Sequence, residues 1–168
     1  MSGMEDLREG LISDWLRARD GMIGQLGKLD EDQLRWVPGP GGRTGLQIAR
    51  HVADAGSSLT QYALTGARVQ GGPPLENPGS REEVIGLLQS GRAEIEARIR
   101  ALSDSQLQEK ITGLLGNQTT RFNFLAFCYA HEMYHWGQLG LWARAGGEIP
   151  ELTQNLEARR KKAAAASS

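Results

Sequence analysis

Apolar residues recur at helical spacing along the first thirty positions of the chain. The repeated positions are three or four residues apart: Leu7, Leu11, Trp15, Ala18, Met22, Leu26 and Leu29. This spacing places them on one face of an amphipathic α-helix. Asp30 is then typical of a cap for a short turn over residues 30–36, and the Pro- and Gly-rich stretch at 38–45 interrupts regular structure.

Three further helices are predicted downstream. Thr44 is a suitable N-cap for a second helix, which should end before the Gly-Gly-Pro-Pro stretch at 71–74. Ser80 and Glu83 have the spacing of a capping box and open a third helix. A fourth helix is predicted from about 123 to 145, because glycines and a proline follow it. No stretch shows the alternation typical of strands.

Four helices of about 20 residues predict an all-α four-helix bundle, with long loops between helices one and two and between helices two and three. We expect one bundle domain over residues 1–150 and a polar C-terminal tail over 151–168. A faint internal repeat is also present, because Leu29-x-x-x-Gln33-Leu34 is echoed by Leu102-x-x-x-Gln106-Leu107. Each copy precedes a loop and a histidine-bearing helix, as a duplicated helix pair would.

Composition narrows the class of protein. A length of 168 residues corresponds to about one domain. Nineteen basic and twenty acidic residues give a net charge of −1, which argues against a nucleic-acid partner. The single cysteine cannot form an internal disulfide, and no apolar run reaches the roughly 20 residues of a membrane span. The first residues, MSGMEDLREG, lack signal-peptide character. We therefore expect a soluble, cytoplasmic protein without a membrane segment.

The fourth predicted helix carries the candidate chemistry. His131 and His135 occupy its core stripe, where leucine would be expected, and their i, i+4 spacing puts both imidazoles on one face. Two buried imidazoles without a shared partner would cost several kcal/mol, roughly 2–7 for each desolvated group, and a metal ion removes that cost. The only other histidine, His51, lies at the edge of the apolar face of the second helix. A bundle can bring all three together around one divalent ion.

The same segment matches the H-E-x-x-H pattern of zinc proteases, in which the glutamate is a general base. Here a third ligand would have to be a carboxylate such as Glu151 or Glu157, and no sheet precedes the helix, so we disfavour that class. Two interpretations of Glu132 remain: it is a catalytic group that steers metal-bound water, or it is a surface glutamate. Gln138 is a candidate hydrogen-bond partner of a ligand histidine or of a water molecule. Cys128 is interpreted as a small buried hydrophobe rather than a metal ligand.

Taken together, these motifs resemble the DinB-like superfamily of four-helix bundles. The resemblance rests on Trp36-Val37-Pro38, on the segment Ile48-Ala49-Arg50-His51-Val52-Ala53 and on His131-Glu132-x-x-His135-x-Gly137-Gln138-Leu139, closed by Gly146. It extends over about residues 5–150. It implies that His51, His131 and His135 bind a divalent metal and that the chain forms a homodimer. The best-understood relatives are metal-dependent enzymes that use low-molecular-weight thiols, including mycothiol-dependent isomerases and bacillithiol transferases.

The resulting functional prediction is a metal-dependent enzyme that acts on a small-molecule substrate. A thiol-dependent transferase or isomerase is favoured, with a low-molecular-weight thiol as a second cofactor. A metal-dependent hydrolase and a non-catalytic metal- or ligand-binding bundle are the alternatives. Imidazole ligands suit zinc or nickel best, with iron, copper and manganese also compatible.

Overall fold

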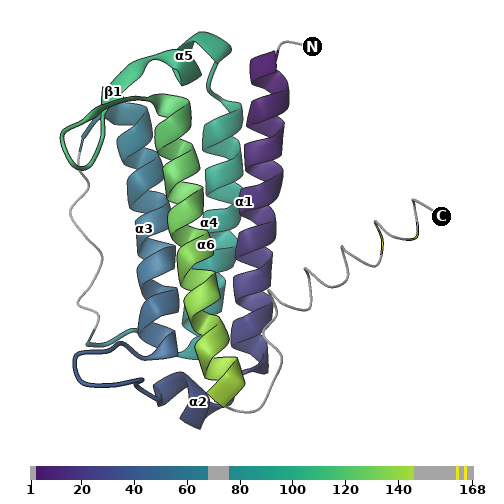
Figure 1. Ribbon diagram of the computed structural model, residues 1–168, viewed down its shortest axis with the longest axis vertical. Coiled ribbons are helices and arrows are strands. Elements are labelled where there is room, and N and C mark those ends of the chain that lie inside the picture. The colour runs from purple at the N-terminus through teal and green to yellow at the C-terminus, as the bar shows by residue number, and fades with distance from the viewer. Residues whose placement is uncertain (1–2, 68–75, 146–161, 163–164, 166–168) are drawn as a thin grey trace.

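Four long helices stand side by side in the computed structural model, which describes residues 3–67, 76–145, 162 and 165 (Figure 1). They are α1 (Gly3–Lys28), α3 (Gly45–Thr65), α4 (Arg81–Arg100) and α6 (Arg121–Ala145). Two five-residue helices, α2 (Glu31–Arg35) and α5 (Asp104–Gln108), lie at opposite ends of the bundle. The predicted all-α four-helix bundle is confirmed. The predicted boundary at residue 150 and almost all of the tail lie outside the described residues.

The helices are not arranged simply up and down. α1 and α6 run toward the end of the bundle that carries α2, whereas α3 and α4 both start at that end (Figure 1). Each of α1 and α3 packs against both α4 and α6. Neighbouring α3 and α4 are therefore parallel, and the connection between them leads from one end of the bundle to the other. The neighbours α3 and α6 are antiparallel.

Side-chain caps fix where the helices begin. Thr44 and Ser80 form the predicted capping boxes of α3 and α4, with the side chains of Gln47 and Glu83 returning the bond. α3 ends at Thr65, because Gly66 adopts a left-handed φ of 68° that ends the helical hydrogen bonding. The apolar stripe predicted for the first helix is buried between these helices from Leu11 to Leu29.

The internal repeat seen in the sequence has a structural counterpart. The turn predicted after Asp30 is the short helix α2, and α5, which the sequence did not predict, occupies the equivalent place after α4. Gln33 and Gln106 close the capping boxes of α2 and α5, and the leucine after each is fully buried. Both halves of the bundle thus consist of a long helix, a capped turn of helix and a second long helix that carries histidine.

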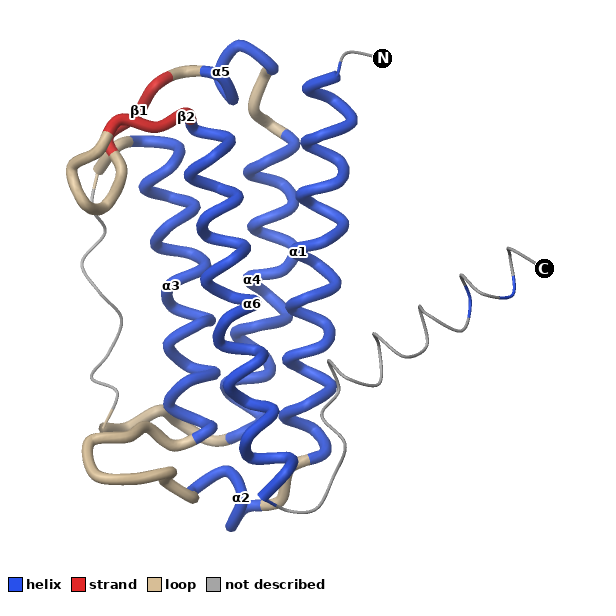
Figure 2. Tube along the Cα trace, in the orientation of Figure 1, coloured by secondary structure: helices blue, strands red, loops and turns tan. Residues whose placement is uncertain are grey.

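A small hairpin contradicts the prediction that the chain has no strands. β1 (Lys110–Thr112) pairs antiparallel with β2 (Gln118–Thr120), with Ile111 opposite Thr119 (Figure 2). Each strand has three residues, which is too short to show a period of two in the sequence. The hairpin connects α5 to α6 and covers one end of the bundle.

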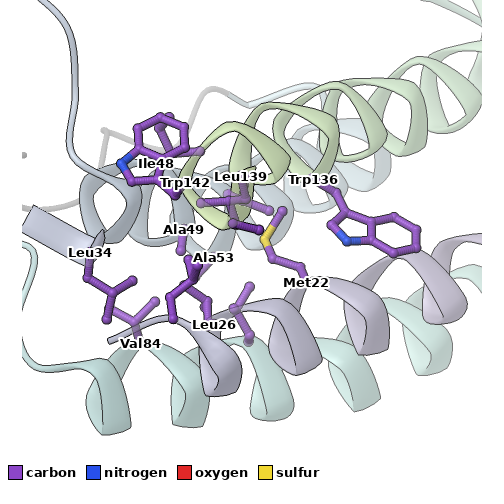
Figure 3. Close-up of a cluster of buried hydrophobic side chains, with 14 of the residues drawn as sticks. Met22, Leu26, Leu34, Ile48, Ala49, Ala53, Val84, Trp136, Leu139 and Trp142 are labelled. Carbon is purple, nitrogen blue, oxygen red and sulfur yellow. The ribbon is translucent and has the colours of Figure 1, made fainter. Parts of the chain in front are cut away.

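The core divides into two clusters along the bundle axis. The cluster at the α2 end contains Met22, Ile48, Val84, Leu139 and Trp142, to which all four long helices contribute (Figure 3). The other cluster, at the α5 end, includes the buried Cys128. None of the described helices is long and apolar enough to cross a membrane.

Candidate metal centre

The antiparallel packing of α3 against α6 brings all three histidines of the chain together. The Nε2 atom of His131 lies 3.3 Å from Nε2 of His51 and 3.1 Å from Nε2 of His135. The ligand atoms of the three side chains all lie within 4.8 Å of one another. Two of the candidate ligands therefore come from successive turns of α6 and the third from the facing helix α3.

The distances of 3.1 and 3.3 Å around His131 suit nitrogens bound to one ion. Metal–nitrogen bonds of about 2.1 Å place two ligand atoms about 3.0 Å apart at octahedral angles and about 3.4 Å apart at tetrahedral angles. The ring planes are inclined by 75–81° to one another, so the imidazoles meet in T-shaped arrangements rather than stacked. The nitrogen lone pairs can then converge on a single point, as metal ligation requires.

A hydrogen bond from His135 to Gln138 fixes the tautomer of this histidine. His135 Nδ1 lies 2.7 Å from the Gln138 side-chain oxygen, which can only accept, so the proton is on Nδ1. The Nε2 atom of His135 consequently presents a lone pair toward His131. Gln138 Nε2 in turn donates to the Tyr134 hydroxyl at 2.9 Å. Gln138 thus lies at the position expected of a partner to a ligand histidine.

The surroundings of the three imidazoles favour their neutral form. Burial, with further contributions from His135, His131 and Arg43, lowers the pKa of His51 to about 4. Burial and the neighbouring His135 lower the pKa of His131. Burial also lowers the pKa of His135, although the Gln138 hydrogen bond opposes it. Neutral imidazole is the form that binds a metal. At neutral pH the three side chains can therefore bind a cation without first losing a proton.

Glu132 follows His131 in the sequence, but its side chain points toward α1 rather than toward α3. Its side chain is 1% exposed, which rules out the surface-glutamate alternative. Arg19 donates from Nε to Oε1 at 2.5 Å and from Nη2 to Oε2 at 2.7 Å, and Trp15 Nε1 donates to Oε2 at 2.7 Å. This carboxylate is therefore held in a buried ion pair with α1, away from water.

Arg19 is a functional neighbour that the sequence reasoning missed. It reaches across the bundle core, where its Nη1 also donates to the Leu88 carbonyl of α4 at 3.3 Å. A Cβ on Gly56 of α3 would lie 2.5 Å from Arg19 Nη2, so only glycine leaves room there. The sequence contained an indication of this buried position, because Arg19 follows Trp15 by four residues on the core face of the first helix. A charged residue at such a position indicates a buried partner.

The other candidate ligands are placed differently. Cys128 is buried among apolar residues, and burial raises the pKa of its thiol to about 12, in line with its interpretation as a small hydrophobe. Glu151 and Glu157 lie outside the described residues. Among the residues that the structure describes, the three histidines form the only group with metal-binding geometry.

A cavity of about 360 Å³ opens beside the histidines. His135 and Gln138 form part of its wall on α6, and Arg43 and Gly42, which precede α3, form part of the opposite wall. The sequence reasoning did not single out Arg43, because no pattern in one sequence shows that this loop folds back over α6.

Comparison with models of protein families gives a match over most of the chain. A sequence model described as the DinB superfamily matches residues 14–139. No curated protein matches the chain.

Solved structures share the fold at low sequence identity. A DinB-like protein from Bacillus cereus superposes with a TM-score of 0.70 at 18% identity, covering 84% of this chain and 94% of that one. YfiT from Bacillus subtilis, described as a probable metal-dependent hydrolase with an unusual four-helix bundle topology, gives 0.72 at 18% identity, covering 88% and 91%.

A mycothiol-dependent maleylpyruvate isomerase gives a TM-score of 0.59 at 15% identity. The match covers 83% of this chain but 62% of the isomerase, which therefore contains a substantial additional part. At these identities the likeness shows a shared fold.

Proposed function

The chain belongs to the DinB superfamily, and on that premise we propose that it is a divalent-metal-dependent enzyme whose metal ligands are His51, His131 and His135. The observation that carries this proposal is that Nε2 of His131 lies 3.1–3.3 Å from Nε2 of His135 and of His51, with all three ligand atoms within 4.8 Å of one another. Zinc or nickel is the proposed ion, because imidazole nitrogen suits both, with iron, copper and manganese as alternatives.

The composition of the site favours a catalytic over a structural role. Structural zinc sites are normally closed by four protein ligands, whereas catalytic sites have three and leave a position for water or substrate. Within the described part of the chain three ligands come together and no fourth joins them. The cavity beside His135 gives a small molecule access to that position.

A thiol-dependent transferase or isomerase is the proposed reaction class. When bound, a divalent ion at this site supplies positive charge that acidifies a thiol or a water molecule in the remaining position. The protein's own thiol does not serve, because Cys128 is buried and its pKa is raised to about 12. No side chain with a free carboxylate joins the described histidine cluster to act as a base. An external low-molecular-weight thiol would need neither a cysteine of the protein nor a carboxylate base. The fold shared with a mycothiol-dependent isomerase is consistent with the use of such a thiol.

A metal-dependent hydrolase is the second candidate. The resemblance to YfiT, a probable metal-dependent hydrolase, favours it. Glu132 does not supply the general base in this proposal, because both of its oxygens are bound by Arg19 and Trp15. Its role is instead to hold α6 against α1, so that His131 and His135 face α3.

Metal content tests the first part of the proposal. Protein purified without chelators or a His-tag should contain one divalent ion per chain by elemental analysis. A chelator should remove the ion and any activity, and adding the ion back should restore both. His51→Ala, His131→Ala and His135→Ala should each lose the ion while retaining the helical circular dichroism of the wild type. A full complement of metal in all three variants would overturn the ligand assignment.

Cobalt(II) substitution distinguishes the two reaction classes. The cobalt-loaded protein should develop a thiolate-to-cobalt charge-transfer band when 2-mercaptoethanol is added, because a thiol in the open position loses its proton to the solvent. Ethylene glycol, which replaces the thiol by a hydroxyl, is the matched control and should produce no such band. Cobalt binding without a band would exclude the thiol branch and leave the hydrolase.

A further inference from the structure

The cavity beside the metal centre combines an apolar lining with a small number of polar groups. Pro38, Ile48, Leu141 and Trp142 provide its apolar walls. Its volume of about 360 Å³ lies within the range of small-molecule sites, which are typically lined in this way. A ligand with a compact apolar body fits such a lining.

Arg43 gives the cavity a positive charge. Its guanidinium forms no hydrogen bond or ion pair with any side chain in the described part of the chain, and no acidic residue is among those that line the cavity. The carboxylate of Glu132 does not offset this charge, since it is paired with Arg19. A cation without a partner that shares the cavity wall with His135 favours an anion.

Tyr134 adds a directed hydrogen-bond donor on the α6 side. Its hydroxyl oxygen accepts the bond from Gln138 Nε2, whose own oxygen accepts from His135 Nδ1. The hydroxyl proton of Tyr134 is therefore left to donate to another group. The side chain is 63% exposed and forms part of the cavity wall, so a ligand can reach that proton.

We infer that the substrate or thiol cosubstrate of this site is a small carboxylate with an apolar body, which Arg43 and Tyr134 bind in the cavity beside His135. Arg43 pairs with the carboxylate of the ligand. The Tyr134 hydroxyl donates a hydrogen bond to the same carboxylate or to an adjacent polar group of the ligand. The apolar walls hold the remainder. The identification as a substrate rests on the proposed function, whereas the preference of the cavity for an anion does not depend on a bound metal.

Calorimetric titration with phenylacetate and phenylacetamide tests this inference, because the two probes have the same shape and differ in charge. Metal-free protein at pH 7.5 is the decisive sample, since a metal ion would itself attract the carboxylate. The wild type should bind phenylacetate at least about tenfold more tightly than the amide, as one charge-assisted hydrogen bond implies. Arg43→Gln should abolish this preference. Equal binding of both probes, binding of neither, or a preference that survives in Arg43→Gln would overturn the inference.

Two further variants complete the test. Arg35→Gln is the matched control, because Arg35 is an exposed arginine on nearby α2, paired with Glu31 and absent from the cavity wall. It should retain the full preference for the anion. Tyr134→Phe should weaken phenylacetate binding about threefold to tenfold, and an unchanged affinity would overturn the assignment of Tyr134.

Failure of this inference is distinguishable from failure of the proposed function. A metal-free protein that prefers the anion but never retains a divalent ion would overturn the metal centre alone. A protein that holds one ion per chain but whose metal-free form shows no preference would overturn the anion site alone.

Discussion

At the scale of single residues, Glu132 and Arg19 form a buried pair that connects α6 to α1. Removing one charge of such a pair leaves the other buried without a partner, which typically costs about 3–5 kcal/mol. Glu132→Gln should therefore lower the free energy of unfolding of the metal-free protein by roughly that amount, measured by urea titration. A general base would show the opposite behaviour, with lost activity at unchanged stability.

An exposed ion pair gives the matched control. Glu96 and Arg100 of α4 form an i, i+4 pair at 3.0 Å near the surface. Glu96→Gln should cost less than about 1 kcal/mol, because exposed pairs contribute little. Replacing both buried partners, as Arg19→Met with Glu132→Leu, should recover part of the lost stability. Equal effects of Glu132→Gln and Glu96→Gln would contradict the buried-pair assignment.

The histidine cluster predicts how the stability of the metal-free protein depends on pH. The folded state lowers the pKa of His51 to about 4 and also lowers the pKa of His131 and His135 from 6.5. The unfolded chain therefore binds more protons than the folded one in this range, and stability rises with pH. The contribution is complete above about pH 6.5 and is lost as the pH falls from there toward 4. The melting temperature should be lower at pH 5 than at pH 7.5.

Removing one of the titrating groups checks the cause. His51→Asn takes away the imidazole with the most strongly lowered pKa, so its melting temperature should change less between pH 7.5 and pH 5 than that of the wild type. An identical pH dependence of the melting temperature in the two proteins would show that the groups responsible for it lie outside His51.

At the scale of secondary-structure elements, α1 and α6 approach closely where Gly21 faces Trp136. A Cβ on Gly21 would lie 2.1 Å from the indole ring, which is buried and has no room to retreat. Gly21→Ala should lower the free energy of unfolding by about 1–3 kcal/mol, the usual cost of overpacking. Gly10→Ala is the control in the same helix, because nothing lies within 4 Å of its Cβ position. It should stabilise the protein by about 0.5–1 kcal/mol through helix propensity.

A result in which Gly21→Ala is as stable as Gly10→Ala would contradict the close helix contact. Thermal or urea unfolding of the two variants side by side is sufficient, since both add the same methyl group to α1.

At the scale of the whole molecule, the outer face of α6 is apolar and exposed. Phe127, Tyr134 and Leu141 follow one another at seven-residue intervals and are 51%, 63% and 47% exposed, with the exposed Ala130 between the first two. Apolar positions repeated every seven residues are typical of helix–helix contacts. This face supports the proposed homodimer, with a total buried interface above about 1,000 Å². Tyr134 and Leu141 would then belong both to the subunit contact and to the cavity wall.

Light scattering on a sizing column tests the dimer at tens of micromolar protein. Phe127→Glu should produce monomers, because it places a charge on the apolar face, at the end away from the cavity. Leu7→Glu should leave the dimer intact, since Leu7 is equally exposed, at 53%, but belongs to α1. A wild type that elutes as a monomer would rule out the homodimer.

The amino-acid sequence by itself determined the helical elements and their caps. Apolar spacing and the local capping residues act within a few positions of one another, so Thr44 and Ser80 could be read directly as helix starts. The spacing of His131 and His135 on one helix is equally local. His51 joined the same site as the only other histidine, at the edge of an apolar helix face, and the resemblance to a family supported this. The hairpin at 110–120 and the helix α5 escaped prediction, because three- and five-residue elements are too short to show a period.

Only the tertiary structure decided which side chains face one another across the bundle. Glu132 and His131 are neighbours in sequence, yet successive helical residues point about 100° apart, so one faces Arg19 of α1 while the other faces His51 of α3. The same holds for Arg43, which contributes to the cavity wall because its loop folds over α6. Local patterns place a residue on its helix face, whereas its partner depends on the packing of helices that are distant in sequence.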